Sequence, residues 1–220
     1  MKTKRIALSD AIELVHEGDT VMVGGFMANG TPENLIDALV EKGVRHLQLI
    51  CNDAGFPDKG VGKMVTQKQF DKITASHIGL NKEAGRQMNE GETIIDLIPQ
   101  GTLIEQIRAG AFGLGGFLTP TGLGTLVAEG KMVIEVDDRT YLLEKPLKAD
   151  VALILADVAD ETGNLQYTGS ENNFNHLMAA NAKTTIVEAR NIVPTGSLSP
   201  SFVHTPGIFV DYIVEGRSLC

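Results

Sequence analysis

The sequence has no tryptophan, only two cysteines, and aromatic residues at 5% of its 220 positions. Two cysteines cannot form a disulfide framework. Cys51 ends the apolar run that begins at His46 and is expected to be a buried strand residue, while Cys220 is the last residue. We therefore expect no disulfide between them. The chain is long enough to bury a hydrophobic core without disulfides or a structural metal.

Long apolar segments and an excess of positive charge are also missing. No stretch approaches the roughly 18 apolar residues of a membrane-spanning helix, and the basic residues near the amino terminus are not followed by the apolar region of a signal peptide. We therefore expect a soluble, cytoplasmic protein. The formal net charge of −9 argues against nucleic acid or an anionic membrane as a partner. An anionic ligand would have to be held by local hydrogen-bond donors.

Segments with strand and helix patterns alternate along the chain. Strands are predicted at residues 21–23, 47–51, 73–78, 94–98, 151–156, 185–188 and 208–214. Helices are predicted after a Ser9 cap, between Pro32 and Gly43, and at residues 101–111 and 173–182. This alternation is typical of βαβ units. We predict an α/β fold with a mainly parallel sheet flanked by helices, in a single domain that spans residues 1–220.

A short antiparallel insert is expected within this layout. Residues 133–136 and 140–143 have strand patterns, and Asp137-Asp138 between them predicts a tight hairpin. No repeat, low-complexity tract or linker is apparent.

The segment in which an apolar strand stops at two glycines is the most informative one. Gly24, Gly25 and Gly30 can adopt positive φ and let a ligand approach the backbone closely. Thr31 is a good helix N-cap and Pro32 suits the first helical position. The pattern predicts a strand that delivers its carboxyl end to a ligand, with free N–H groups at a nearby helix start.

Residues 109–125 form a second glycine-rich stretch, with two phenylalanines and no charged residue. Such a stretch forms neither a stable helix nor an ordinary solvated linker. We expect it to line a ligand channel or an interface with another subunit. The alternative is a loop folded back on its own core.

Several motifs together resemble those of a known family. Residues 17–26, followed by Gly30-Thr31-Pro32, resemble the signature of the alpha (A) subunits of class I CoA-transferases, the 3-oxoacid and acetate/butyrate–acetoacetate enzymes. Glu17 departs from that signature, which usually has Asp or Asn there. Further motifs follow in the family's order along nearly the whole chain, beginning at Cys51, Pro99, Glu105, Thr119, Asp150, Gly163, Asn173 and Thr205.

The resemblance implies a chain that works with a beta subunit, as an α2β2 heterotetramer. In the family, a glutamate attacks an acyl-CoA thioester such as acetoacetyl-CoA. A glutamyl-CoA thioester then passes CoA to a short-chain acid such as acetate or butyrate, in a ping-pong mechanism. CoA is therefore a substrate, and no tightly bound cofactor is implied. The glutamate lies in a Ser-Glu-Asn-Gly motif of the beta subunit, which this chain lacks, so we expect no catalytic nucleophile here and no activity from the chain alone.

The segment Gly169-Ser170-Glu171-Asn172-Asn173 is similar to that nucleophile motif, with the glycine replaced. Glu171, however, directly precedes a stretch that belongs to the alpha-subunit pattern. We interpret Glu171 as an acidic residue in the first turn of the helix that runs to Ala182, stabilised by the helix dipole.

The binding residues implied by the resemblance lie at predicted strand ends. The loop expected to face CoA consists of Gly24, Gly25, Phe26, Met27, Ala28, Asn29 and Gly30. The amide of Gln100 is placed against the substrate carboxylate or thioester oxygen, the alternative being a helix cap. Asn52 and Asp53 would lie near the acyl pocket or form an ordinary Asx turn.

Several charged residues are interpreted more conservatively. Arg108 is expected to pair with Glu105 at helical spacing. Lys59, Lys63 and Arg86 are available for the CoA phosphates, although the partner could supply the basic groups. The histidines lack the spacing of metal ligands, so no metal site is expected.

The sequence also leaves open a function of a different kind. The chain could be a stand-alone sugar-phosphate isomerase-like or phosphate-ligand-binding α/β protein. The glycines lack the Gly-x-Gly-x-x-Gly spacing of a nicotinamide site, and no convincing base accompanies a phosphate cradle. Activity that depends on a partner chain would distinguish the CoA-transferase hypothesis from these alternatives and from a non-catalytic scaffold.

Overall fold

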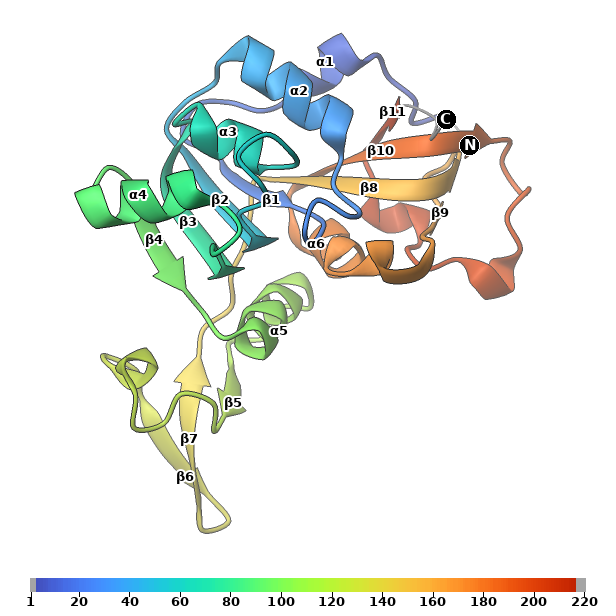
Figure 1. The fold of residues 1–220 in the computed structure, drawn as a ribbon. Helices are drawn as coiled ribbons and strands as arrows, with labels where there is room; N and C mark the ends of the chain where they lie inside the picture. Colours follow the sequence, from blue (N-terminus) through green and yellow to red (C-terminus); the bar gives the residue numbers. More distant parts are fainter. Residues whose placement is uncertain (1–2, 217–220) are drawn as a thin grey trace.

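A computed structural model describes residues 3–216, so Cys220 lies outside the described residues (Figure 1). Within them, the main sheet has eight strands in the order β11-β10-β8-β1-β2-β3-β4, with β9 beside β8. Its strands are β1 (Thr20–Val23), β2 (Leu47–Asp53), β3 (Phe70–His77), β4 (Ile94–Leu97), β8 (Val151–Asp160), β9 (Leu165–Gln166), β10 (Thr184–Val193) and β11 (Tyr212–Glu215). All neighbours pair in parallel except β9 with β8, which confirms the predicted sheet.

Helices cover both faces of this sheet, with the first helices on one side and the later ones on the other (Figure 1). They are α1 (Leu8–Ile12), α2 (Glu33–Lys42), α3 (Gly62–Thr66), α4 (Lys82–Glu90), α5 (Gln100–Ala111) and α6 (Asn175–Asn181). Short 3-10 turns lie at η1 (Leu126–Ala128), η2 (Gly169–Asn172), η3 (Pro200–Phe202) and η4 (Gly207–Phe209).

The alternation of side chains along β1 divides the interior into two hydrophobic clusters. Val21 and Val23 belong to the cluster under α2 and α3, whereas Met22 between them belongs to the cluster that contains α5 and α6. Successive strand residues point to opposite faces, so a strand buried on both sides contains an unbroken apolar run. This is why the sequence shows Val-Met-Val here without polar alternation.

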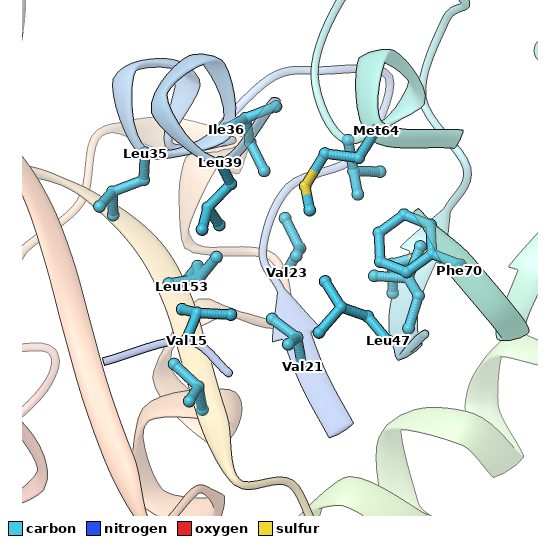
Figure 2. Close-up of a cluster of buried hydrophobic side chains, with 14 of the residues drawn as sticks. Val15, Val21, Val23, Leu35, Ile36, Leu39, Leu47, Met64, Phe70 and Leu153 are labelled. Carbon is cyan, nitrogen blue, oxygen red and sulfur yellow. The ribbon is translucent and has the colours of Figure 1, made fainter. Parts of the chain in front are cut away.

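In the first cluster, one face of α2 packs against the strands of the main sheet (Figure 2). Leu35, Ile36 and Leu39 recur at helical spacing and are fully buried against the strands below. Burial of such side chains stabilises the fold by about 1.5–3 kcal/mol each. This packing fixes α2, and with it the loop that joins β1 to α2.

A three-stranded antiparallel sheet projects from the body of the molecule (Figure 1). It contains β5 (Phe117–Thr119), β6 (Val133–Val136) and β7 (Arg139–Glu144), in the order β5-β7-β6. The hairpin predicted through Asp137 and Asp138 is confirmed, and both residues have the positive φ of a tight hairpin turn, at 48° and 60°.

The second glycine-rich stretch leads from α5 into this insert. Its first residues end α5, and Phe112 and Leu114 follow with 55% and 42% of their surface exposed. The stretch is therefore not folded back on a core of its own chain. The expected role of the stretch at a ligand channel or an interface with another subunit stays a prediction.

Some predicted element ends are wrong. Helix α1 starts at Leu8 after Ala7, so Ser9 lies inside the helix and does not cap it. The strand predicted at residues 208–214 is shorter, because residues 207–209 form η4 and Ile208 is 85% exposed. An apolar residue can face solvent where the backbone turns, and its pattern alone does not show this.

Candidate functional site

The predicted site residues meet at the carboxyl edge of the main sheet. The loop of residues 24–30 follows β1, Asn52 and Asp53 end β2, and Gln100 begins α5 after β4. The chain runs from β1 outward through β2, β3 and β4, whereas β8 leads outward in the other direction through β10 and β11. The strand order therefore reverses between β1 and β8. In open α/β sheets ligands bind at such a switch point, beyond the carboxyl ends of the strands.

Residues 26–29 form a tight turn at the tip of the loop after β1. The N–H of Phe26 donates to the carbonyl of Asn29 and the reverse pair also forms, both at 2.9 Å. Met27 and Ala28 have φ values of 52° and 60°, although neither is glycine. Such conformations cost roughly 1–3 kcal/mol each and persist only where neighbouring groups hold them.

The Asp53 carboxylate is one of the groups that hold this turn. Its Oδ2 accepts a hydrogen bond from the N–H of Met27 at 3.2 Å. Burial raises the pKa of Asp53, although the hydrogen bond from Met27 and the nearby His77 oppose the shift. Burial likewise raises the pKa of the Cys51 thiol, two residues earlier, with the Asp53 charge adding to the effect. Asp53 thus supports the loop rather than forming only a local Asx turn.

Two glycines of the loop are required by close packing within the chain, which the sequence did not reveal. A Cβ on Gly24 would lie 1.5 Å from Asn175 Oδ1, and one on Gly30 would lie 2.7 Å from the carbonyl oxygen of Glu171. The loop therefore packs tightly against residues 169–175 of its own chain. These contacts account for both glycines within the chain, and the approach of a ligand to this loop stays a prediction.

Only some of the backbone N–H groups of residues 24–30 are left to donate hydrogen bonds to a ligand. Some donate within the chain, namely those of Gly24, Phe26, Met27 and Asn29. Three have no acceptor in the part of the chain that the structure describes, those of Gly25, Ala28 and Gly30. An acceptor oxygen of a bound substrate could be held only by this second set.

The N–H groups at the start of α2 already have an acceptor within the chain, so the prediction that they are free for a ligand is wrong. Pro32 is the cap residue, and Thr31 Oγ1 donates to the carbonyl of Gly24 at 3.0 Å instead of capping the helix. The buried Glu188 of β10 takes that place. Its Oε2 accepts from the N–H groups of Asn34 and Leu35 at 2.8 and 3.1 Å. The predicted anion site at this helix start is therefore filled by a carboxylate of the chain.

A cluster of amides lies beside the loop. Asn52 is fully buried, and its Oδ1 accepts from Ser76 Oγ at 2.7 Å and from Gln100 Nε2 at 3.1 Å. Asn52 Nδ2 donates to Asn173 Oδ1 at 3.2 Å. The Gln100 side chain is thus oriented by Asn52 and does not cap α5. Amides held in this way are preorganised hydrogen-bond donors of the kind that stabilise developing negative charge.

Sequence reasoning named two members of this cluster and assigned no role to the other two. Ser76 lies in β3, next to β2, and a strand-end serine is too common a feature to predict a site. Asn173 stands in a motif that pointed to the family but to no function. Its partner Asn52 is 121 residues away in sequence, so only the fold brings the two together.

The turn after β2 repeats the geometry of the turn after β1. Gly25-Phe26 and Gly30 have counterparts in Gly55-Phe56 and Gly60, and residues 56 and 59 exchange backbone hydrogen bonds as residues 26 and 29 do. A Cβ on Gly60 would lie 3.1 Å from the Cβ of Ala28, so the two turns are in contact. This short repeat was not recognised in the sequence, where only glycine and phenylalanine are shared.

Two of the cations considered for the CoA phosphates are already paired. Lys63 contacts the carboxylates of Glu33 and Asp37, and Arg86 contacts three glutamates, Glu83, Glu90 and Glu92. The expectation that both are available is therefore wrong. Lys59 makes no ion pair with any residue from 3 to 216.

Arg108 and Glu171, two further charged residues considered in the sequence, also form ion pairs. Arg108 pairs with Glu105 at 2.8 Å, as predicted. Glu171 belongs to η2 and not to α6, and its carboxylate forms two hydrogen bonds with Arg190, at 2.6 and 2.7 Å. Both side chains are largely buried, at 13% exposure each. Its interpretation as a dipole-stabilised residue of the first turn is therefore wrong, because its charge is matched by arginine.

Comparisons with known proteins show which family the chain belongs to. The family model described as "Coenzyme A transferase" matches residues 5–216. The chain belongs to the coenzyme A transferase family. Among the relatives of this CoA-transferase chain, the acetate CoA-transferase subunit alpha of Escherichia coli K12 is 53% identical over 99% of both chains. The acetoacetyl-CoA:acetate/butyrate CoA transferase alpha subunit of Clostridium acetobutylicum is 46% identical, over 98% of this chain and 99% of its own.

Solved CoA-transferase structures share the fold. An acyl-CoA transferase of E. coli O157:H7, solved as a thioester complex with CoA, superimposes with a TM-score of 0.87 at 21% identity. This alignment covers 97% of the present chain and 47% of that longer one. Glutaconate coenzyme A-transferase of Acidaminococcus fermentans also has a TM-score of 0.87, at 19% identity, over 98% and 76% of the two chains. No helix among the described residues is long and apolar enough to cross a membrane.

Proposed function

We propose that this chain is the alpha subunit of a heteromeric CoA-transferase that moves CoA between acetoacetyl-CoA and a short-chain acid such as acetate or butyrate. The observation that carries the proposal is the 53% identity, over 99% of both chains, to a protein named as an acetate CoA-transferase alpha subunit. The proposed partner is a beta subunit, in an α2β2 assembly. The proposed location is the cytoplasm.

The chemistry assigned to the assembly is a ping-pong transfer. A glutamate carboxylate of the beta subunit attacks the thioester carbonyl, the C–S bond breaks, and CoA leaves as a thiolate, which gives a mixed acyl-glutamyl anhydride. The thiolate then attacks the glutamyl carbonyl, and the acetoacetate carboxylate leaves. The second acid attacks the resulting glutamyl-CoA thioester and takes up CoA by the same steps in reverse.

The acidic side chains of this edge support the assignment of the nucleophile to a partner. A nucleophilic carboxylate needs a free oxygen that faces the substrate. Asp53 Oδ2 already accepts from Met27, and both oxygens of Glu171 are held by Arg190. Glu171 is therefore not a free nucleophile and Asp53 already supports the loop, whereas the Gln100 amide is placed as a donor.

The role proposed for this chain is therefore binding and charge stabilisation. The N–H groups of Gly25, Ala28 and Gly30 and the Gln100 amide would hold the thioester or carboxylate oxygen as negative charge develops on it. The loop of residues 24–30 would face CoA, and Asn52 and Asp53 would support the acyl pocket. Both anhydride and thioester react with water, so the two chains together must keep water out.

Reconstitution tests the proposal. The chain is produced alone and together with a beta subunit that contains Ser-Glu-Asn-Gly, and transfer of CoA from acetoacetyl-CoA to acetate and butyrate is followed. We expect transfer only from the two chains together, with a CoA adduct on the beta subunit detected by mass spectrometry. Turnover by the isolated chain, or a complex without transfer, would contradict the proposal.

A further inference from the structure

The backbone of Asn173 adopts a conformation that asparagine rarely takes. Its φ and ψ are 29° and −120°, and those of Phe174 are −88° and −7°. These angles are close to a type II′ turn, whose first central position strongly favours glycine. A side chain there strains the backbone, and such strain is typical of sites where the side chain is needed for function.

The side chain at this strained position connects the two halves of the sheet edge. Asn173 follows β8 and β9, on one side of the switch point, and Asn52 ends β2 on the other side. Asn173 Oδ1 accepts from Asn52 Nδ2 at 3.2 Å, and Asn52 Oδ1 in turn accepts from Gln100 Nε2 at 3.1 Å. A single chain of hydrogen bonds therefore runs from the strained turn to the amide expected to touch the substrate.

The surroundings hold the turn in place. Asn175 Nδ2 donates to the carbonyl of Glu171 at 2.7 Å and to that of Gly30 at 3.1 Å, which ties the turn to the loop after β1. The Glu171 carboxylate is fixed by Arg190 on β10. Strain at Asn173 is thus imposed by contacts on both sides of it.

We infer that Asn173 is a positioning residue for CoA transfer: it fixes the Asn52 amide and, through it, the Gln100 amide at the switch point. This inference rests on the proposed function and names a residue to which that function had assigned no role. A donor must be in place before charge develops on the substrate oxygen, because reorientation during the reaction would cost the same free energy that the donor supplies.

Two substitutions at this position separate positioning from a structural role. Asn173→Gly removes the amide and relieves the backbone strain, whereas Asn173→Ala removes the amide and keeps the strain. We expect the glycine variant of the reconstituted complex to melt at the same or a higher temperature than the parent, and the alanine variant to melt lower. Both should lose roughly ten- to hundredfold in kcat, with a smaller change in KM, as expected for a displaced catalytic group.

Lys68 provides the matched control. It has a φ of 54°, it is exposed, and it lies before β3 at the amino edge of the sheet, away from the site. Lys68→Gly relieves a positive φ far from the site and also removes the ion pair of Lys68 with Glu92, and it should leave CoA transfer unchanged. The double variant Asn173→Gly/Gln100→Ala should be no slower than Gln100→Ala alone, because both changes disable the same donor.

The outcomes are distinct. An Asn173→Gly complex with kcat within twofold of the parent would overturn the inference, and so would a double variant whose loss equals the product of the two single losses. Full activity in the glycine variant with loss only in the alanine variant would assign Asn173 a purely structural role. If the parent complex itself fails to transfer CoA, the proposed function fails instead.

Discussion

Glu171 and Asn173 lie two positions apart in one turn, yet the sequence predicts the surroundings of neither. The resemblance of residues 169–173 to a nucleophile motif raises the question of the role of Glu171, but its partner Arg190 lies in β10, 19 residues later. The strain at Asn173 is equally invisible, because asparagine is a common turn residue. Sequence reasoning found Gln100, Asn52 and the glycine loop because they directly follow or end apolar strands and because they stand in motifs that resemble those of the family.

The ion pair of Glu171 leads to a prediction that also tests its exclusion as nucleophile. Glu171→Gln should lower the free energy of unfolding by about 1.5–3 kcal/mol, because the largely buried Arg190 loses the carboxylate that accepts two of its hydrogen bonds and keeps only the more distant Asp157, at 3.7 Å. In the reconstituted complex the CoA adduct should persist, since the nucleophile is expected on the beta subunit. Urea unfolding and mass spectrometry measure the two effects.

The matched control for this substitution is Glu105→Gln, which breaks the more exposed pair with Arg108. It should change stability by no more than about 1 kcal/mol. Loss of the adduct in an assembled Glu171→Gln complex would show that Glu171 takes part in the covalent chemistry.

At the scale of elements, local patterns predicted helices and strands better than their ends. The apolar stripe of α2 and its stop at Gly43 follow from helical periodicity and from a glycine in the left-handed region. The start of the same helix does not follow from the local sequence. The acceptor for the N–H groups of Asn34 and Leu35 is the carboxylate of Glu188, more than 150 residues later. A cap supplied by a distant strand leaves no local signal, so the local pattern predicts Thr31 as the cap, and this prediction is wrong.

The helix glycines supply a test at this scale. Gly85 lies inside α4, and nothing lies within 4 Å of the place where its Cβ would be. Gly85→Ala should raise the free energy of unfolding by about 0.5–1 kcal/mol, because glycine loses more backbone entropy in a helix than alanine does. Urea unfolding of the purified chain measures this change.

Gly110 in α5 is the counterpart with the opposite expectation. A Cβ there would lie 1.9 Å from the carbonyl oxygen of Leu147, so Gly110→Ala should destabilise the chain. If Gly85→Ala destabilised the protein as well, the packing of α4 would differ from that described.

At the scale of the whole molecule, the alternation of strands and helices was enough to predict a parallel sheet with helices on both faces. It could not predict where the strand order reverses, because that depends on which strand pairs with β1 across the sheet. The observed neighbour is β8, which begins 128 residues after β1 ends. The position of the antiparallel insert depends in the same way on contacts that join α5 to β7.

Those contacts centre on Glu144, the last residue of β7, whose side chain is 1% exposed. Its Oε1 pairs with Lys131 Nζ at 2.5 Å, and its Oε2 accepts from Gln106 Nε2 of α5 at 2.9 Å. This buried carboxylate therefore links the insert to α5 through Gln106 and holds Lys131 within the insert. Loss of one partner from a buried ion pair is strongly destabilising, by about 3 kcal/mol or more.

We therefore predict that Glu144→Gln loosens the insert without unfolding the main sheet. Amide hydrogen exchange in residues 117–119 and 133–144 should become roughly a hundredfold faster, which corresponds to about 3 kcal/mol, while β8 and β10 keep their protection. Glu135→Gln on the exposed β6 is the control and should leave exchange in both parts unchanged. Equal loss of protection in the insert and in β8 would instead mean that the two unfold together, and that Glu144 stabilises one cooperative unit.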